Sequence, residues 1–384
     1  MQPFKAYPVL AELLKPLRRS QQKTLALLVA AIAEAGTART LRIAAELAAW
    51  LDIRLDSALN RLYRALRNPR IDWLALQEQL LGLLGKRLGP RLLIAIDWTE
   101  WHPPLRMLLA SVVVDRRAIV VQAEAFDRQQ MPRSQNAREN TFVRLLAATV
   151  HRAGLQAVLL CDRGFRRVSW LSLLQSLRMD FVVRLMDDVT VHSEALGQSM
   201  PLKRLALRPG QVLDLGHVEL HREAKVTVRV VGLWSKGAKE PWWLATSLQE
   251  PVERIVAYYD RRMAIEEQIR DQKGCRFGVK LYWTQFRNPE HLARFTRLVG
   301  LALCLWYAAG VQAARKRPSL RLPDRRKGPR RSYLTIGIAE IRRIRRRHPM
   351  TAQRLLQAIP PPSLRIFDWI AQALAPPTPS AAQK

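Results

Sequence analysis

Leu92-Leu93-Ile94-Ala95-Ile96-Asp97 is a short apolar run that ends in a carboxylate, and Val158-Leu159-Leu160-Cys161-Asp162 repeats the same pattern further along the chain. Apolar runs of this length are typical of strands that are buried inside a sheet. Carboxylates at the ends of such strands are good ligands for hard divalent metal ions. We therefore interpret Asp97 and Asp162 as a candidate pair of metal ligands in a mixed α/β fold.

The residues around these two runs predict the order of elements in a catalytic core over residues 86–185. Strand patterns at residues 107–114 and 118–125 predict a hairpin that follows the first strand. Helix, strand, helix and strand patterns follow at residues 137–153, 157–161, 168–178 and 181–185. The expected order is β-β-β-α-β-α-β, and the two acidic residues end the first and fourth strands.

The next segment, residues 186–250, interrupts this α/β order and is interpreted as a β-rich insertion. Short alternating runs bounded by Gly and Pro predict strands at residues 211–215, 217–221, 226–233 and 242–246. Residues 251–314 then return to helical patterns. We expect one long helix from residue 252 to about 273, and a second that opens at Asn288-Pro289, a capping residue followed by a first-turn proline.

Helical regions are expected at both ends of the chain. Residues 1–85 predict a helical DNA-binding domain, in which a helix capped by Asp56 places Arg61 and Arg64 away from its apolar face. An ordinary solvated helix face explains that pattern equally well. Residues 315–374 predict a basic loop and a C-terminal helical region, and residues 375–384 a disordered tail.

The charge of the chain favours a polyanionic partner. Its 384 residues include 63 Lys and Arg against 32 Asp and Glu, a formal net charge of +31. An excess of this size favours nucleic acid or an anionic membrane surface. We expect no membrane association, because the longest apolar stretch, residues 298–311, is shorter than the roughly 20 residues of a spanning helix. The three cysteines predict neither a zinc site nor a disulfide framework, which fits a reducing cytoplasm.

The most specific pattern lies on the predicted helix that contains Glu266. Tyr259, Arg262, Glu266 and Lys273 follow one another at intervals of three, four and seven residues, which places them on one helix face. A carboxylate between two cations and a phenol suits a metal ligand whose neighbours hold phosphates. A solvated helix with an Arg262–Glu266 ion pair is the alternative, and the spacing alone does not separate the two.

This spacing, Y-x2-R-x3-E-x6-K, resembles the signature of bacterial insertion-sequence transposases of the DDE type with a Tyr-Arg-Glu-Lys motif. The segments Ile96-Asp97-Trp98-Thr99 and Cys161-Asp162-Arg163-Gly164-Phe165 resemble the first and second acidic motifs of that family. The resemblance spans roughly residues 40–310. It implies an RNase H-like core with the β-rich insertion between the last core strand and the Glu-bearing helix.

The resemblance also implies a chemistry and a set of contacts. Asp97, Asp162 and Glu266 would be catalytic and bind two Mg²⁺ ions, with Mn²⁺ as a substitute, for phosphoryl transfer on DNA. Contacts with DNA are then expected from the residues that flank these acids and from an aromatic residue of the insertion that stacks on a flipped base. The expected DNA-binding residues are Tyr259, Arg262, Lys273, Arg163, Trp242 and Trp243, together with Arg61 and Arg64 of the helical domain.

The function implied is that of a DNA transposase that binds terminal inverted repeats, cleaves the ends and joins them to target DNA. We expect a homodimer in the DNA complex, held by apolar runs at residues 336–344 and 355–374, with no small-molecule substrate and a cytoplasmic, nucleoid-associated location. Two alternatives stay open: a metal-dependent nuclease of the same fold that does not join strands, and an inactive relic that only binds DNA. A basic membrane-surface protein fits less well, because the apolar side of residues 343–347 is thin.

Overall fold

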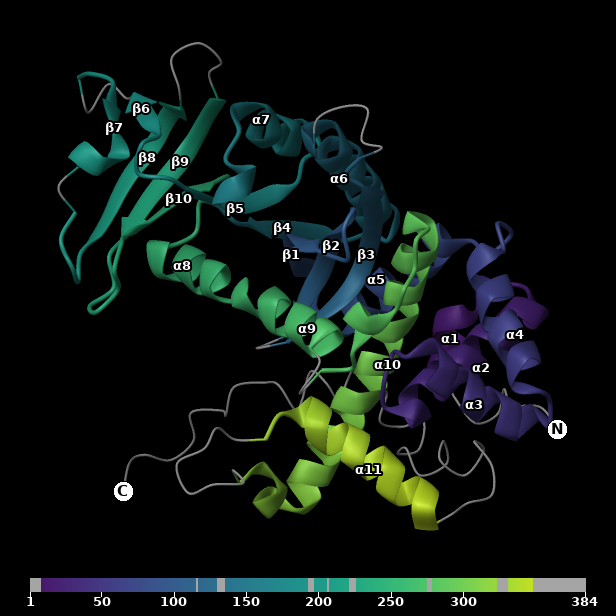
Figure 1. Cartoon of the computed structure of the whole chain (residues 1–384). Coiled ribbons are helices and arrows are strands. Elements are labelled where there is room, and N and C mark those ends of the chain that lie inside the picture. Colours follow the sequence, from purple (N-terminus) through teal and green to yellow (C-terminus); the bar gives the residue numbers. More distant parts are fainter. Residues whose placement is uncertain are drawn as a thin grey trace.

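The computed structural model describes residues 8–114, 117–129, 135–192, 197–205, 207–220, 226–274, 278–322 and 331–347. Its centre is a ten-stranded sheet with strand order β3-β2-β1-β4-β5-β10-β9-β8-β6-β7. Helices cover the half of the sheet that contains β1 to β5, whereas the strands of the other half extend away from the helices (Figure 1).

The covered half of the sheet confirms the predicted element order. Strand β1 pairs antiparallel with β2 and parallel with β4, and β4 pairs parallel with β5. Helices α6 and α7 connect β3 to β4 and β4 to β5. The bounds are β1 (Arg91–Glu100), β2 (Leu105–Val114), β3 (Arg117–Asp127), α6 (Gln135–Arg152), β4 (Gln156–Cys161), α7 (Val168–Ser176) and β5 (Asp180–Leu185).

Burial explains why these strands lie at the centre of the protein. Ile94, Ala95 and Ile96 are consecutive residues of β1 and all three are buried, as is typical of a strand covered on both faces. Helices α5 (Trp73–Leu88) and α9 (Met263–Lys273) pack against β1 and β3, α10 (Pro289–Lys316) packs against β3, and α6 packs against β4. The apolar runs that end in Asp97 and Asp162 are therefore held by packing in the core, and this packing also fixes the backbone of the two acidic residues.

The predicted β-rich segment extends the same sheet, because β10 pairs antiparallel with β5. Strands β8, β9 and β10 form an antiparallel meander. The prediction of separate strands at residues 211–215 and 217–221 is wrong: they form one strand, β8, with a register shift at Gly216, whose φ is +61°. The bounds are β6 (Thr190–His192), β7 (Met200–Pro201), β8 (Val212–Leu220), β9 (Val226–Leu233) and β10 (Trp242–Thr246).

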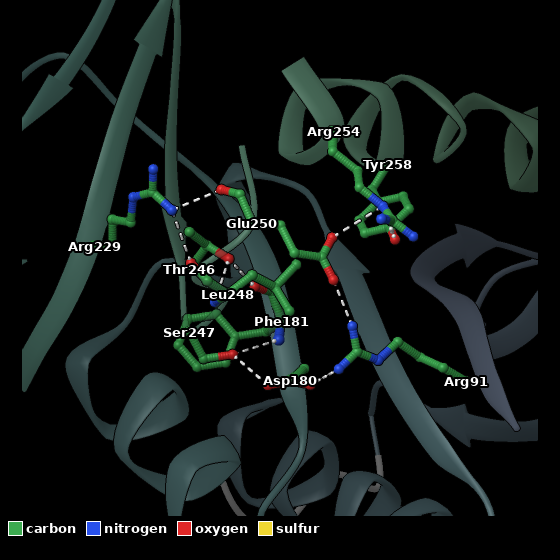
Figure 2. A network of polar contacts seen from close by, with 10 residues as sticks. All are labelled: Arg91, Asp180, Phe181, Arg229, Thr246, Ser247, Leu248, Glu250, Arg254 and Tyr258. Carbon is green, nitrogen blue, oxygen red and sulfur yellow. Dashed lines mark hydrogen bonds and ion pairs between the residues drawn. The ribbon is translucent and has the colours of Figure 1, made fainter. Parts of the chain in front are cut away.

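A polar network joins this outer half of the sheet to the start of β1 (Figure 2). The carboxylate of Glu250 pairs with Arg91 at 2.5 Å and with Arg254 of the following helix at 3.3 Å. Arg229 on β9 donates to the carbonyl of Glu250 at 2.7 Å. The connection from β10 into the next helix is therefore tied to both halves of the sheet.

That next helix is interrupted, which corrects the prediction of one continuous helix. Helix α8 (Val252–Asp260) and helix α9 (Met263–Lys273) are separated by Arg261 and Arg262. Both residues keep right-handed helical backbone angles, and their N–H groups donate to carbonyls three residues back. One tighter turn is thus inserted at Arg262, and such turns within helices often occur at functional sites.

The N-terminal region is helical as predicted, and its described residues form five helices. Asp56 lies in the first turn of α4 and does not cap it, because Arg54 occupies the cap position. Asp72 caps α5, which leads directly into β1, through bonds from the N–H groups of Leu74 and Ala75. The bounds are α1 (Pro8–Leu14), α2 (Arg19–Ala35), α3 (Thr40–Leu51), α4 (Leu55–Arg67) and α5 (Trp73–Leu88).

Helix α10 (Pro289–Lys316) is capped by Asn288, which accepts from the N–H of His291 as the Asn-Pro pattern predicts. It is the one helix of the described residues that is long and apolar enough to cross a membrane by itself. However, 78% of its most apolar window is buried inside the protein. It packs against β3, α2 and α11, as a core helix does.

Helix α11 (Tyr333–Arg347) packs closely on α10, and this changes the interpretation of the C-terminal apolar run. A Cβ atom on Gly310 would lie 1.9 Å from the carbonyl oxygen of Tyr333, so only glycine allows this approach. Ile336 and Ile341 are buried by their own chain. These two residues of the 336–344 run are therefore used inside the chain, and the part of this run in joining two subunits stays a prediction. Residues 355–374 and the expected tail at 375–384 lie outside the described residues.

Candidate active site

Asp97 and Asp162 lie at the same edge of the sheet. Ile96 of β1 is the register partner of Cys161 of β4 in a parallel pair, so the next residues on the two strands emerge side by side. The carboxylate of Asp162 accepts from the N–H of Gly164 at 2.9 Å and so begins the short helical turn that follows β4.

Glu266 joins them from the first turn of α9, which packs against β1. The guanidinium of Arg262 connects the two elements: its Nη2 lies 2.6 Å from Glu266 Oε1, and its Nη1 lies 3.5 Å from Asp97 Oδ2. Arg262 is only 9% exposed. The break between α8 and α9 therefore places a buried cation between two of the three predicted catalytic acids.

Electrostatics show that the third acid belongs to the same cluster. The pKa of Asp97 is raised to about 6: burial is the largest cause, Arg262 opposes the rise, and the charges of Asp162 and Glu266 contribute to it. Burial also lowers the pKa of Arg262, but Tyr259, Asp97 and Glu266 outweigh it and the pKa is raised. Arg262 thus contacts two of the three carboxylates, and Asp162 acts on Asp97 through its charge, so carboxylates outnumber guanidinium groups in this cluster.

The cluster suits a hard divalent cation in its donor chemistry and its charge. Its three carboxylates supply the oxygen ligands that Mg²⁺ and Mn²⁺ prefer. In the described part of the chain, however, no three His, Cys, Asp or Glu side chains lie close enough together to hold one ion in the present arrangement. The contact of Arg262 with both Asp97 and Glu266 means that this side chain must move before the acids can share an ion.

Tyr259 packs against Arg262, and Trp242 in turn packs against Tyr259. Tyr259 is 4% exposed, and its ring centroid lies 5.9 Å from the guanidinium carbon of Arg262. Burial raises the pKa of the Tyr259 hydroxyl. Trp242 on β10 packs edge-on against Tyr259, with ring centroids 5.1 Å apart. The β-rich segment therefore contacts the site through Trp242.

Lys273 reaches the end of β1 just beyond Asp97. Its ammonium donates to Thr99 Oγ1 at 3.0 Å and to the carbonyl oxygen of Glu100. The same nitrogen lies 5.6 Å and 5.4 Å from the ring centroids of Trp101 and Tyr282. Burial lowers the pKa of Lys273, and Glu100 opposes that effect.

The remaining predicted DNA contacts lie in different surroundings. Arg163 is exposed beside Asp162, 3.9 Å from Glu240, and Arg61 and Arg64 are exposed on α4. Trp243 is 2% exposed, and its ring fills the space above Gly232. Trp243 therefore presents no free face to a base, and its assignment as a DNA contact is corrected because its ring packs within the fold.

A family model described as "Transposase DDE domain" matches residues 110–305, just over half of the chain. The chain belongs to the DDE transposase family. The match includes Asp162 and Glu266, and it begins after Asp97. DDE transposases are divalent-metal-dependent enzymes that act on DNA, and their core is RNase H-like. The α/β fold with an RNase H-like core, the transposase function and DNA as partner are thereby confirmed at the level of the family.

Among solved structures, the chain is similar to the cryo-EM structure of a piggyBac transposase synaptic complex with hairpin DNA. The TM-score is 0.41 and the identity 11%, over 98% of this chain and 82% of the other. No curated protein matches the sequence.

Proposed function

We propose that this DDE transposase is the cut-and-paste enzyme of a bacterial insertion sequence. It binds the terminal inverted repeats, cleaves the ends and joins them to target DNA. The observation that carries the proposal is the gathering of three acids around Arg262. Asp97 and Glu266 contact it directly, and Asp162 is close enough to raise the pKa of Asp97. A surplus of carboxylates at a buried strand edge suits phosphoryl transfer better than it suits structural support.

In this proposal Asp97, Asp162 and Glu266 hold two Mg²⁺ ions, for which Mn²⁺ can substitute. Bound ions of this kind activate the attacking oxygen and stabilise the leaving oxygen of a phosphodiester. Asp97 must be ionised to act as a ligand, and its raised pKa makes that state more costly than for an exposed Asp. Arg262 must release Asp97, and a DNA phosphate is the partner that its planar, two-pronged donor group fits best.

On this interpretation Tyr259, Arg262, Glu266 and Lys273 have different roles. Tyr259 is buried and holds Arg262 in place, so its contribution to DNA binding is indirect. Arg262 and Lys273 lie on either side of Glu266 along the helix and contact phosphates near the transposon end. Trp242 is the aromatic residue of the β-rich segment that remains available for a flipped base, because it is only partly buried.

Further parts of the proposal concern the outer surface and the assembly. Arg163 lies beside Asp162 and extends the phosphate contacts, while Arg61 and Arg64 on the exposed side of α4 bind the repeat further from the cleavage point. A homodimer forms on the paired ends, in the cytoplasm at the nucleoid, and no small molecule is a substrate. The boundaries predicted for the helical, catalytic and β-rich regions remain predictions of this scheme.

The test is cleavage and joining of a duplex that ends in the inverted repeats found beside the coding sequence. With Mg²⁺, the wild-type chain should cleave that end and join it to a target plasmid. The variants Asp97→Asn, Asp162→Asn and Glu266→Gln should bind the duplex without cleaving it, and Glu78→Gln, a surface change on α5, should act as wild type.

Full cleavage by one amide variant would remove that residue from the site. Cleavage without joining would instead identify a nuclease, and binding alone an inactive relic.

A further inference from the structure

A fourth carboxylate, which neither the motif spacing nor the proposed chemistry uses, contacts residues that lie close in sequence to Asp97 and Asp162. Glu139 is on α6 and is 1% exposed. Its Oε1 accepts from Trp98 Nε1 at 2.7 Å and from Gln135 Nε2 at 2.8 Å. Its Oε2 pairs with Arg167 Nη1 at 2.5 Å. Both oxygens of a fully buried carboxylate are therefore engaged.

The two oxygens of Glu139 hold different segments of the chain. Trp98 is the residue after Asp97 on β1, whereas Arg167 closes the turn that begins at Asp162 and is the cap residue of α7. These contacts join residues 41 and 28 positions apart in sequence. Glu139 thus connects the end of β1 to the segment that follows β4, and these are the two places from which Asp97 and Asp162 emerge.

The surroundings of Glu139 restrict its movement. The guanidinium of Arg106 on β2 lies 5.1 Å from the Trp98 ring centroid and donates to Gln135 Oε1 at 2.9 Å. The guanidinium of Arg167 lies 5.8 Å from the ring of Trp170. Strands β1 and β2 and helices α6 and α7 all meet at this carboxylate. A rotation of Glu139 would therefore disturb several contacts at once.

A charged group is an expensive way to fill such a position. Burying a carboxylate carries a desolvation penalty, and well-packed apolar residues often replace a buried ion pair without loss of stability. Packing alone does not require Glu139 and Arg167. The bonds of Glu139 to Trp98 and Arg167 are directional, so they hold the two segments in one relative orientation.

We propose that Glu139 and Arg167 are positioning residues of the transposase, which set the spacing between Asp97 and Asp162 that divalent-metal binding requires. The inference rests on the proposed function, because it needs Asp97 and Asp162 to be the ligands. Groups that orient metal ligands typically change metal affinity or activity by about 10–100-fold when they are substituted. Glu139 and Arg167 reach Asp97 and Asp162 through the backbone of the residues beside them.

The first test compares Glu139→Gln with wild type. The amide can still accept from Trp98, but it no longer pairs with the charge of Arg167. The Mn²⁺ affinity of the full-length protein without DNA, measured by electron paramagnetic resonance of free Mn²⁺, should fall about 10-fold or more. The Mg²⁺ midpoint of end cleavage should rise in parallel, while affinity for the end duplex stays unchanged.

Arg167→Lys and Arg167→Gln provide the second arm, since Arg167 is partly exposed and its variants keep the buried carboxylate. Lysine should restore much of the Mn²⁺ affinity that glutamine loses, and Glu139→Gln with Arg167→Gln together should be no worse than the poorer single variant. The matched control is Arg152→Gln, which breaks the exposed Arg152–Glu78 pair at the far end of the same helix and should leave Mn²⁺ affinity unchanged.

The inference is overturned if Glu139→Gln or Arg167→Gln lowers the melting temperature while the Mn²⁺ affinity and the Mg²⁺ midpoint stay as in wild type. The ion pair would then only support the fold. A different result would contradict the proposed function, namely that Asp97→Asn or Asp162→Asn retains cleavage. The two failures can therefore be told apart. If Glu139→Gln does not fold, the Arg167 pair of variants decides the question by the same two measurements.

Discussion

One arginine–carboxylate group contains Asp97 itself and a second contacts its neighbour Trp98, and the two groups differ in their balance of charge. In the first group, Arg262 contacts Asp97 and Glu266, and the pKa of Asp97 is raised to about 6, chiefly by burial and also by the charges of Asp162 and Glu266. Around Glu139, one carboxylate has all its partners: Arg167, Trp98 and Gln135. The first group has a deficit of positive charge, and the second does not.

The comparison separates groups that can exchange partners from groups that are fixed. A cluster with excess carboxylates is stabilised when a further cation binds to it. The contacts that Arg262 makes with Asp97 and Glu266 can therefore be replaced by contacts with a metal ion. A buried carboxylate with both oxygens engaged is destabilised whenever its cation leaves, because it remains charged and unsolvated. We therefore expect substitutions in the two groups to have different effects on the cleavage rate, on stability, on metal affinity and on the salt dependence of DNA binding.

The largest difference should appear in the rate of end cleavage. Asp162→Asn or Glu266→Gln removes a charged ligand, and we expect a loss of about 1000-fold or more, since metal ions contribute several kcal/mol to such reactions. Glu139→Gln should lose about 10–100-fold. Single-turnover cleavage at saturating Mg²⁺ measures both. Equal losses would show that the two groups do not have separate roles.

The next difference is one of sign, in the stability of the metal-free protein. The folded-state pKa of Asp97 lies above its ordinary value of 3.8, so the folded protein holds this proton more tightly than the unfolded chain does. Stability therefore falls as pH rises from about 4 to 6, and the penalty is fully present at pH 8. Asp97→Asn should remove a penalty of about 1–3 kcal/mol at pH 8 and none at pH 4.

Glu139→Gln should act in the opposite direction, because it leaves the charge of Arg167 without its carboxylate. We expect it to lower stability at pH 8 by at least about 1 kcal/mol. Urea unfolding in the presence of a chelator, at pH 4 and pH 8, compares both variants with wild type. A loss of stability in Asp97→Asn at pH 8 would contradict the charge surplus that we assign to the first group.

The sequence identifies the first group and misses the second, for a physical reason. Asp97 and Asp162 end recognisable apolar runs and Glu266 lies within one helix pattern, so local sequence together with the family resemblance identifies all three as candidates. Glu139 is one charged residue among several on α6, and its partners are brought to it only by the folded sheet. No local pattern distinguishes it from a solvated helix residue.

The same limit explains the other corrections to the sequence predictions. The element order from β1 to β5 follows from alternation and turn residues, and it is confirmed. The burial of Trp243 over Gly232 and the packing of α11 on α10 depend on contacts between distant segments. The break at Arg262 also escapes periodicity, because its backbone stays close to helical values while its hydrogen bonds shorten by one residue.

A smaller effect is expected on metal affinity when the buried cation of the first group is removed. In Arg262→Gln the guanidinium no longer competes for Asp97 and Glu266, so the DNA-free protein should bind Mn²⁺ more tightly, by about 10-fold, as expected for roughly 1.4 kcal/mol of lost charge competition. Arg167→Gln should bind Mn²⁺ more weakly. Titration with Mn²⁺ at constant ionic strength checks both, and weaker binding by Arg262→Gln would show that Arg262 holds the acids in place.

The smallest difference should appear in the salt dependence of binding to the end duplex. If Arg262 exchanges Asp97 for a phosphate, it neutralises one DNA charge, and each such contact contributes about −0.9 to the slope of log affinity against log salt concentration. Arg262→Gln should therefore reduce the magnitude of that slope by about 1. Arg167, whose charge is already matched by Glu139, should leave the slope unchanged when it is replaced by glutamine.

Fluorescence anisotropy over a range of salt concentrations, in Ca²⁺ to prevent cleavage, measures the slopes. An unchanged slope in Arg262→Gln would mean that Arg262 stays with the acids in the DNA complex, and the distinction between a replaceable and a fixed group would no longer hold.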